Sequence, residues 1–321
     1  MPALVSIVIP CWNAEETIAR AISSALSQTY PRTEVIVIDD GSTDGSLDAI
    51  RGFDKQTYWE AQPNQGACVA RNRGMQIASG DYLQFLDADD ELLPEKIAHQ
   101  MAIVEDVGPE LTFVAGAYAY RGVDKRDWCF SPLSDDPWLA LLRGGGALGI
   151  TSSNLWRANA LQAVGGWNAD WQSSQDTELM FRLLRNGAQI AYDEKTLTIV
   201  HEQRESVSRS SSHACFKPAA WRNWLKLRSH IVTFLESKSD LTAKRHDQFQ
   251  MKVIEFARGY WNQDQEEALK ALEKYMAGRR LRLFRAKLAY RVAFNLGGFR
   301  FAEACRSRFR IWRRRRGLPT A

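Results

Sequence analysis

The sequence predicts an α/β protein in which a mainly parallel sheet is flanked by helices and followed by a helical C-terminal extension. Over the first hundred residues, short apolar strands alternate with helical patterns, and the links between them are short. From about Phe216 onward the strand pattern disappears and only helical patterns remain. The chain has 321 residues, 45% of them hydrophobic, which is enough for one large core with an extension.

The individual elements follow from local patterns. Val5–Ile9 is a β-branched run typical of a strand buried on both faces. Asn13 is expected to cap a helix whose apolar stripe includes Ile18 and Ile22. Further strands are expected at residues 34–38, 57–61, 82–86, 111–120 and 151–156, and further helices after residue 64, from residue 92 and at 175–186. Ligands of such a sheet gather at the carboxyl ends of its strands.

Positive charge is concentrated near the C-terminus. Residues 277–316 hold 14 Lys and Arg and a single acid, Glu303, whereas the rest of the chain holds 28 bases and 37 acids. We therefore expect two parts, an α/β domain over residues 1–215 and a basic α-helical extension over residues 216–321.

The basic extension has an apolar stripe whose members recur every three or four residues: Leu281, Phe284, Leu288, Val292 and Leu296. One interpretation is that this stripe packs on the first domain and the arginines are solvated. The other is that the basic helices lie on an anionic membrane surface, where each arginine contributes about 1 kcal/mol. The sequence leaves both interpretations open.

Composition predicts a cytoplasmic protein, with peripheral attachment to the inner membrane face if the basic helices bind lipid. No run of about 18 apolar residues is present, so no transmembrane helix is expected. The first residues lack a basic segment and a cleavage site, which argues against a secretory signal. The five cysteines are scattered and form no CxxC pair, which fits reduced thiols.

Two acidic clusters each follow an expected strand. In Asp87-Ala88-Asp89-Asp90, three carboxylates within four positions favour a hard divalent cation, although an acidic helix N-terminus would explain them too. Asp39-Asp40-Gly41-Ser42 is either a capped glycine turn or a carboxylate site for a nucleobase or ribose. The chain has no GxGxxG after a strand and no GxxxxGK[ST], which weakens dehydrogenase and P-loop interpretations.

Several segments together resemble the family-2 glycosyltransferases, which have the Rossmann-like GT-A fold. In order, they are VSIVIPCWN, VIVIDDGSTDGS, NQGACVARNRG and ASGDYLQFLDADDELLP. Further on, VGGWN and QDTELMFRLLRNG resemble that family's acceptor-side segment. The resemblance covers roughly residues 4–205, so it identifies residues 1–215 as a GT-A catalytic domain.

The resemblance implies a nucleotide-sugar donor site. Pro10 and Asn13 would lie beside the base, Asp40 would hold the base, and Asp39 would support the turn. Arg71 would reach the base or the diphosphate, although a solvated helix arginine is the alternative.

The resemblance also implies a metal site and a catalytic base. Asp87 and Asp89 would form the pair that holds Mn²⁺ or Mg²⁺, with Asp89 on the metal and Asp87 on the ribose or the metal. Asp90 would support them, and Asp176 would be the general base at the start of a helix. His201 is either a further metal or diphosphate ligand or a structural residue.

The implied activity is inverting transfer of a sugar from a nucleoside diphosphate, with a UDP-sugar favoured, to an acceptor hydroxyl. The acceptor would be a saccharide or a lipid-linked saccharide in cell-surface polysaccharide or glycoconjugate synthesis. At position 175 the chain has glutamine, where the family more often has glutamate. We expect this difference to affect acceptor specificity more than activity. Four tryptophans either stack on acceptor sugars or pack in the core: Trp128, Trp138, Trp167 and Trp171.

Three other classes of protein compete with this interpretation. The arginine-rich end would give a nucleic-acid-binding protein non-specific phosphate affinity, but no recognition motif is present, so no specific nucleic acid is expected. A nucleotidyltransferase also uses paired carboxylates and a metal, and differs by releasing pyrophosphate. A catalytically inactive scaffold is disfavoured because Asp40, Asp87, Asp89 and Asp176 are all present.

Overall fold

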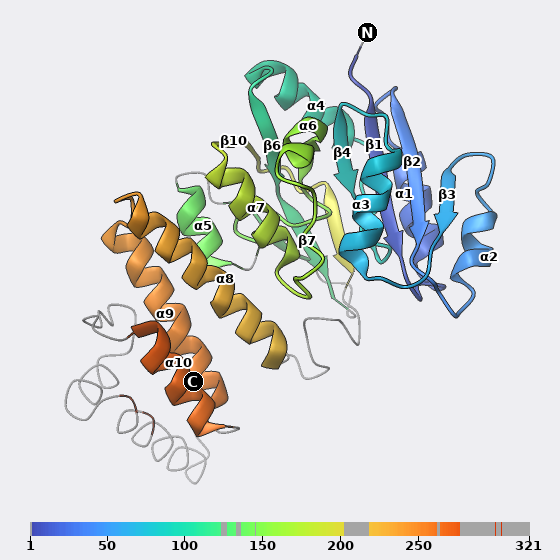
Figure 1. Cartoon of the computed structure of the whole chain (residues 1–321). Helices are drawn as coiled ribbons and strands as arrows, with labels where there is room; N and C mark the ends of the chain where they lie inside the picture. Colours follow the sequence, from blue (N-terminus) through green and yellow to red (C-terminus); the bar gives the residue numbers. More distant parts are fainter. Residues whose placement is uncertain are drawn as a thin grey trace. The chain divides into compact units, whose positions relative to one another are not determined.

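The computed structural model describes residues 2–122, 127–132, 136–144, 146–201, 218–261 and 264–276, together with Phe299 and Glu303 (Figure 1). The chain divides into two compact units, Met1–Leu227 and Arg228–Ala321. This division falls inside helix α8 (Pro218–Ser237), so the boundary expected near residue 216 stays a prediction.

The first unit contains a seven-stranded sheet with the order β10-β6-β9-β4-β1-β2-β3. Its strands are β1 (Val5–Cys11), β2 (Thr33–Asp39), β3 (Tyr58–Ala61), β4 (Tyr82–Phe85), β6 (Leu111–Gly116), β9 (Leu155–Arg157) and β10 (Gln189–Asp193). Strand β9 is antiparallel to both of its neighbours, and the other pairs are parallel. The predicted α/β class with a mainly parallel sheet is therefore confirmed.

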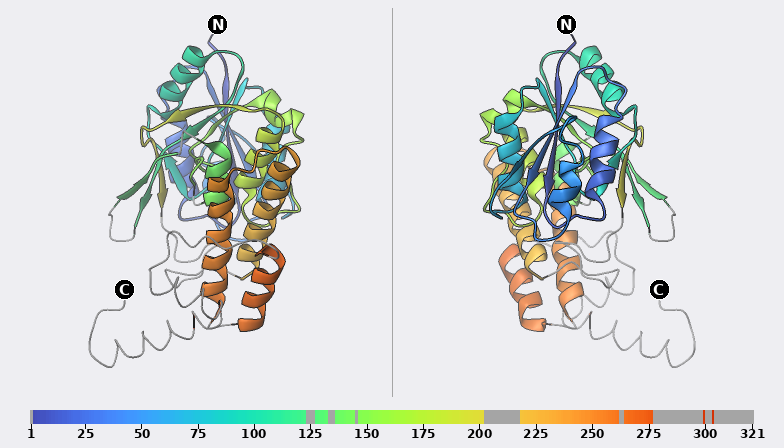
Figure 2. Two further views of the ribbon diagram at one scale, coloured as in Figure 1. Left: turned by 90° about the vertical axis from the view of Figure 1, so that its left-hand side faces the viewer. Right: turned by 90° about the vertical axis from the view of Figure 1, so that its right-hand side faces the viewer.

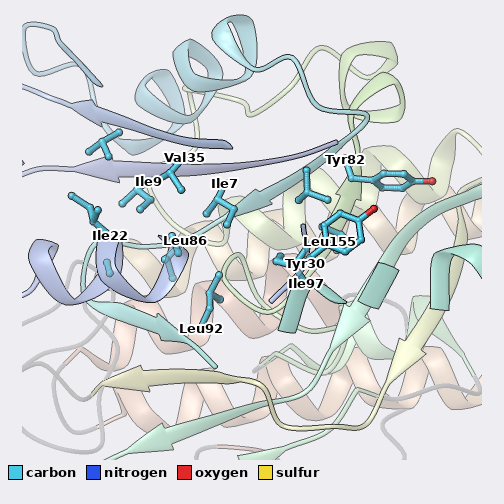
Figure 3. Close-up of a cluster of buried hydrophobic side chains, with 14 of the residues drawn as sticks. Ile7, Ile9, Ile22, Tyr30, Val35, Tyr82, Leu86, Leu92, Ile97 and Leu155 are labelled. Carbon is cyan, nitrogen blue, oxygen red and sulfur yellow. The ribbon is translucent and has the colours of Figure 1, made fainter. Parts of the chain in front are cut away.

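Helices cover both faces of this sheet (Figures 1 and 2). Among the described residues, the first seven helices of the chain are α1 (Ile18–Leu26), α2 (Ser46–Arg51), α3 (Ala67–Ile77), α4 (Lys96–Val107), α5 (Pro137–Arg143), α6 (Ala158–Ala163) and α7 (Gln175–Arg185), and α5 packs on α7. All seven residues of β1 are buried, because alternate side chains face helices on opposite sides. Ile7 and Ile9 join Ile22 of α1 in one core cluster (Figure 3). On the other face, a Cβ at Gly74 of α3 would lie 2.2 Å from Val8 Cγ1, so this helix needs glycine to pack closely.

A smaller sheet has the order β5-β11-β7-β8. It contains β5 (Asp90–Leu92), β7 (Tyr118–Arg121), β8 (Asp127–Phe130) and β11 (Thr198–His201). The prediction of a single strand at residues 111–120 is wrong. The strand is interrupted at Ala117, where the chain passes from the large sheet into the small one. The Ala117 N–H donates to the Asp193 carbonyl at 2.8 Å, which fixes this break.

Two local expectations about helix starts are also wrong. The helix expected from residue 92 begins later, at Lys96, because Asp90–Leu92 pairs with β11 as a strand. Asn13 does not cap α1, whose N-cap is Thr17. Instead Asn13 has φ +48°, a left-handed conformation that asparagine tolerates, and its Oδ1 accepts a hydrogen bond from the Thr43 N–H at 2.8 Å.

The second unit is helical over the residues that the structure describes. Helix α9 (Ala243–Tyr260) packs against α10 (Gln265–Met276), and Thr242 caps α9 by accepting from the Arg245 N–H. The apolar stripe expected at residues 281–296 lies outside the described residues. Within the part of the chain that is described, no helix is both long enough and apolar enough to span a membrane.

Lys96, at the start of α4, is a buried lysine within the first unit. Its side chain is 1% exposed, and Nζ has no hydrogen-bond partner among the described residues. Burial lowers the pKa of Lys96 well below its usual value of 10.5, and the carboxylate of Asp193 only partly opposes this shift. As pH falls below about 10.5, the unfolded chain takes up a proton that the folded chain does not, so this residue makes the fold less stable toward lower pH.

We therefore expect Lys96→Met to raise the free energy of unfolding at pH 7 by about 1–3 kcal/mol, the cost of a buried polar group without a partner. The substitution should also flatten the dependence of stability on pH between about 8 and 10. Urea denaturation across this pH range measures both effects. Lys195→Met is the control, because Lys195 is exposed and pairs with Glu95 at 3.0 Å. A Lys96→Met variant that is less stable than the wild type would show that the ammonium group is charged and partnered in the fold.

Candidate active site

The polar loops after β1, β2 and β4 meet at one edge of the large sheet. The register pairs Cys11 with Asp39 and Val8 with Phe85, so these three parallel strands end side by side. The two acidic clusters predicted from the sequence therefore lie at the carboxyl edge, where ligands of such sheets bind. Pro10 lies within β1 opposite Ile38 and is buried, one residue before the strand ends.

The loops after β1 and β2 are hydrogen-bonded to each other. The Asn13 N–H donates to Ser42 Oγ at 3.0 Å, and the Ala14 N–H donates to Ser46 Oγ at 2.7 Å. Together with the bond from Thr43 to Asn13, these contacts hold the two loops in one arrangement. Burial raises the pKa of the nearby Cys11 thiol to about 12, which leaves it protonated and unsuited to act as a nucleophile.

Asp39 and Asp40 are both buried, but their oxygens have different partners. Asp40 Oδ1 accepts from Gln62 Nε2 at 2.7 Å and from the Gln65 N–H at 3.0 Å, and Asp40 Oδ2 accepts from the Gly66 N–H at 2.7 Å. Asp39 Oδ2 accepts a bond from the turn, whereas Asp39 Oδ1 has no hydrogen-bond partner among the described residues. These contacts favour Asp39 rather than Asp40 as the carboxylate available to a ligand.

Arg71 connects the second acidic cluster to the start of α7. It is 5% exposed, so it is not a solvated helix arginine. Its Nη2 donates to Asp87 Oδ1 at 2.7 Å and its Nη1 donates to Gln175 Oε1 at 2.9 Å. The guanidinium carbon lies 4.7 Å from the centroid of the Trp167 ring, a cation–π contact. Gln175 Nε2 in turn donates to the Trp171 carbonyl at 2.9 Å, which fixes the orientation of this amide.

The acidic cluster after β4 brings three carboxylates together within four positions. Asp90 is buried, and Ser152 Oγ donates to Asp90 Oδ2 at 2.6 Å. Burial raises the pKa of Asp90 well above its usual value, and the carboxylates of Asp87 and Asp89 raise it further. Mg²⁺ and Mn²⁺ bind one or two carboxylates together with phosphate oxygens, so the donor set of Asp87 and Asp89 fits such a cation. Sequence reasoning missed Ser152, which carries no motif signal.

His201 lies at the end of β11, directly after the residue that pairs with Asp90. Its Nε2 is 3.1 Å from Glu91 Oε2, and burial lowers the pKa of His201 while Glu91 opposes the shift. Among the described residues, no three His, Cys, Asp or Glu side chains are grouped so that they could hold a metal ion. The structure therefore does not bring His201 together with Asp87 and Asp89 as a three-residue ligand set.

Asp176 lies in the first turn of α7, where the helix dipole stabilises its negative charge. Its Oδ1 accepts from the Thr177 N–H at 2.7 Å. Asn72 of α3 fixes the preceding loop, because it accepts from the Trp167 N–H at 2.8 Å and donates to the Trp167 carbonyl at 2.7 Å. Through Gln175 and Arg71, the helix that carries Asp176 is tied to the acidic loop.

The four tryptophans considered from the sequence have different environments. Trp167 is buried against Phe85, with ring centroids 5.1 Å apart, so it belongs to the core. Trp138 packs edge-on against Phe181 at 6.2 Å. Trp171 lies 5.3 Å from the ammonium group of Lys226. Trp128 on β8 is exposed, unlike the other three.

Comparison with known proteins identifies the class. Residues 6–144 match the profile of the family described as Glycosyl transferase family 2. An uncharacterized glycosyltransferase of Haemophilus influenzae is 40% identical over 121 residues, which are 36% of this chain and 48% of that protein. The Escherichia coli UDP-Glc:alpha-D-GlcNAc-diphosphoundecaprenol beta-1,3-glucosyltransferase WfaP is 41% identical over 104 residues, or 32% of this chain and 41% of that protein.

Solved structures show the same fold at low identity. S. aureus TarS 1-349 in complex with UDP-GlcNAc has a TM-score of 0.56 at 16% identity and covers 87% of this chain and 93% of that one. The mannosyltransferase PcManGT of Pyrobaculum calidifontis in complex with GDP-Man and Mn²⁺ has a TM-score of 0.51 at 16% identity, covering 98% and 81%. The chain thus has the GT-A fold, and its residues 6–144 match the family-2 glycosyltransferase profile. It spans less than half the length of the curated relatives named here.

The contacts of Asp40 predict that this residue is structural. Asp40→Ala should lower the free energy of unfolding by about 1–3 kcal/mol, because it leaves part-buried donors of the loop before α3 without their charged acceptor. Urea denaturation measures the change. Asp48→Ala is the matched control, because Asp48 is an exposed aspartate whose ion pair with Arg51 contributes little. An Asp40→Ala variant as stable as this control would return Asp40 to the ligand-binding role.

Proposed function

We propose that the chain is an inverting glycosyltransferase that moves a sugar from a nucleoside diphosphate donor to an acceptor hydroxyl. The observation that carries the proposal is the buried Arg71, which joins Asp87 of the acidic loop to Gln175 at the start of the helix bearing Asp176. On this proposal, the contact would link a site for a diphosphate and cation, within the residues 6–144 that match the family-2 profile, to a carboxylate suited to proton removal further along the chain.

On this proposal, the donor nucleotide binds where the loops after β1 and β2 meet. Asp39 Oδ1, which is buried and has no partner among the described residues, would accept a hydrogen bond from a base N–H. Pro10 and Asn13 would border the base. We favour UDP as the nucleotide, because TarS was solved with UDP-GlcNAc and WfaP is named for UDP-Glc.

A divalent cation would be held by Asp87 and Asp89, where it would supply Lewis-acid stabilisation to the departing diphosphate. PcManGT, which was solved with Mn²⁺, supports this choice of cofactor. Arg71 has two roles in the proposal. Its charge offsets that of Asp87, and it holds the acidic loop at a fixed distance from α7.

The transfer step requires one proton acceptor. Asp176 would take the proton of the acceptor hydroxyl as the hydroxyl oxygen attacks the anomeric carbon. The new glycosidic C–O bond forms on the face opposite the leaving group, and the bond to the phosphate oxygen breaks with its electron pair leaving on the nucleoside diphosphate. A single displacement of this kind inverts the anomeric configuration.

We further propose that the acceptor is a saccharide, either free or lipid-linked, in envelope polysaccharide synthesis. The names of WfaP and of the putative teichuronic acid biosynthesis glycosyltransferase TuaG of Bacillus subtilis support this acceptor class. A cytoplasmic location with attachment to an anionic inner membrane face would suit a lipid-linked acceptor. That attachment rests on the charge of residues 277–316, nearly all of which lie outside the described residues.

Asp89→Asn should abolish Mn²⁺-dependent transfer and leave the fold intact, because it removes one of two carboxylates that would hold the cation. Release of UDP from UDP-sugars, with and without Mn²⁺, measures the activity, and Mn²⁺ binding is measured separately by electron paramagnetic resonance. Asp106→Asn, an exposed aspartate at the end of α4, is the control. Turnover by Asp89→Asn at the wild-type rate in the presence of chelator would exclude the metal role.

Asp176→Asn should keep donor affinity and reduce transfer by a factor of about 10²–10⁴, the usual contribution of a general base. The assay compares UDP binding with product formation, and Asp170→Asn in the exposed loop before α7 is the control. Unchanged turnover would move the base elsewhere. Release of pyrophosphate instead of UDP would identify a nucleotidyltransferase and contradict the proposed function.

A further inference from the structure

One face of the β7–β8 hairpin is made of aromatic side chains. Tyr118 pairs with Phe130 and Tyr120 pairs with Trp128, and residues that pair across strands point to the same face. The rings of Tyr118 and Phe130 are stacked with centroids 5.1 Å apart and an angle of 11° between their planes. Tyr120 lies edge-on to Phe130 at 5.8 Å. We call these four residues the aromatic face.

The outer half of the aromatic face is open to solvent. Trp128 is 51% exposed and Phe130 is 39% exposed. Both belong to β8, an edge strand of the small sheet, and among the described residues no further strand pairs with its outer side. Large exposed aromatic side chains that sit side by side mark binding surfaces more often than isolated ones do.

The aromatic face lies on the same side of the small sheet as Asp90. Asp90 pairs with Val200, Val200 pairs with Tyr120, and Tyr120 pairs with Trp128, so these four residues form one row across the whole small sheet. All four side chains therefore share one face. Three steps between neighbouring strands place Trp128 about 14 Å from Asp90. A ligand that reaches from the acidic loop to Trp128 must be at least about 14 Å long, the length of about three pyranose rings.

We propose that the aromatic face is a subsite for the acceptor glycan, holding pyranose rings that lie beyond the sugar at which the bond forms. This inference rests on the proposed function for its choice of acceptor. Pyranose rings present C–H surfaces that pack on aromatic rings, and tryptophan and phenylalanine lose little side-chain entropy when they bind. The row of paired residues from Asp90 to Trp128 places the exposed rings of β8 on the same side of the small sheet as the buried Asp90.

Charge and size distinguish a glycan from other occupants. In the two strands, Arg121 pairs with Asp127 at 2.9 Å, and no other charged residue occurs in them, so the hairpin strands are neutral overall. A surface that binds anionic lipid carries an excess of Lys and Arg instead. Two exposed rings on a four-residue strand also offer far less area than the roughly 800 Å² that each partner buries in a standard protein interface.

The test uses the full chain on an array of short pyranose oligosaccharides, followed by isothermal titration with the tightest binder. Trp128→Ala and Phe130→Ala should each weaken binding by about tenfold, the effect of losing one aromatic contact. Trp128→Tyr should restore most of the affinity. Tyr58→Ala is the matched control and should bind like the wild type, because Tyr58 is also 51% exposed but lies on β3, the edge strand of the large sheet.

Other results would overturn the subsite. These are the absence of wild-type binding to any arrayed oligosaccharide, and equal binding by Trp128→Ala. If Trp128→Ala changes the oligomeric state measured by light scattering, the aromatic face is a self-association surface. If Trp128→Ala loses co-sedimentation with lipid vesicles that the wild type shows, the aromatic face binds lipid. UDP-sugar binding is measured in parallel. Glycan binding through Trp128 without UDP-sugar binding would contradict the proposed function alone, whereas the reverse pattern would contradict the subsite alone.

Discussion

The geometry of the candidate site depends on the buried guanidinium of Arg71. A charge removed from water needs charged or polar partners, because its lost hydration is otherwise uncompensated. Arg71 finds these partners in Asp87 and Gln175, and the face of Trp167 covers it. The acidic loop and the start of α7 must therefore approach the same side chain. The guanidinium group of Arg71 thus sets the separation between the site proposed for the diphosphate and Asp176.

The sequence predicted most of the large sheet because burial there follows a local pattern. The β-branched run in β1 and the alternation of strands and helices are visible in short windows of sequence. The division of residues 111–120 between β6 and β7 was not predictable in this way. That segment is apolar apart from Thr112, and the break at Ala117 depends on the carbonyl of Asp193, which is distant in the chain. Similarly, Asp90–Leu92 becomes a strand only because β11 pairs with it.

The positions of the motif residues were predictable, but their partners were not. Arg71 and Gln175 are 104 positions apart, and no local sequence pattern predicts their contact. The assignment of base binding to Asp40 rested on the order of the motifs. The structure distinguishes Asp39 from Asp40 by a different criterion, because the N–H groups of the loop before α3 donate their hydrogen bonds to Asp40. Ser152 was overlooked for the same reason, since only the folded chain brings it to Asp90.

The hydrogen bonds between the loops after β1 and β2 have a consequence for recognition. Because Asn13 bonds to Thr43 and Ala14 bonds to Ser46, the conformational entropy of both loops is already lost when the chain folds. A ligand that binds at these loops meets a preorganised surface, and little of its binding free energy is consumed in ordering the protein. A rigid surface also cannot rearrange around a ligand of the wrong shape. Selectivity at this end of the site should therefore come from shape, independently of any loop closure elsewhere.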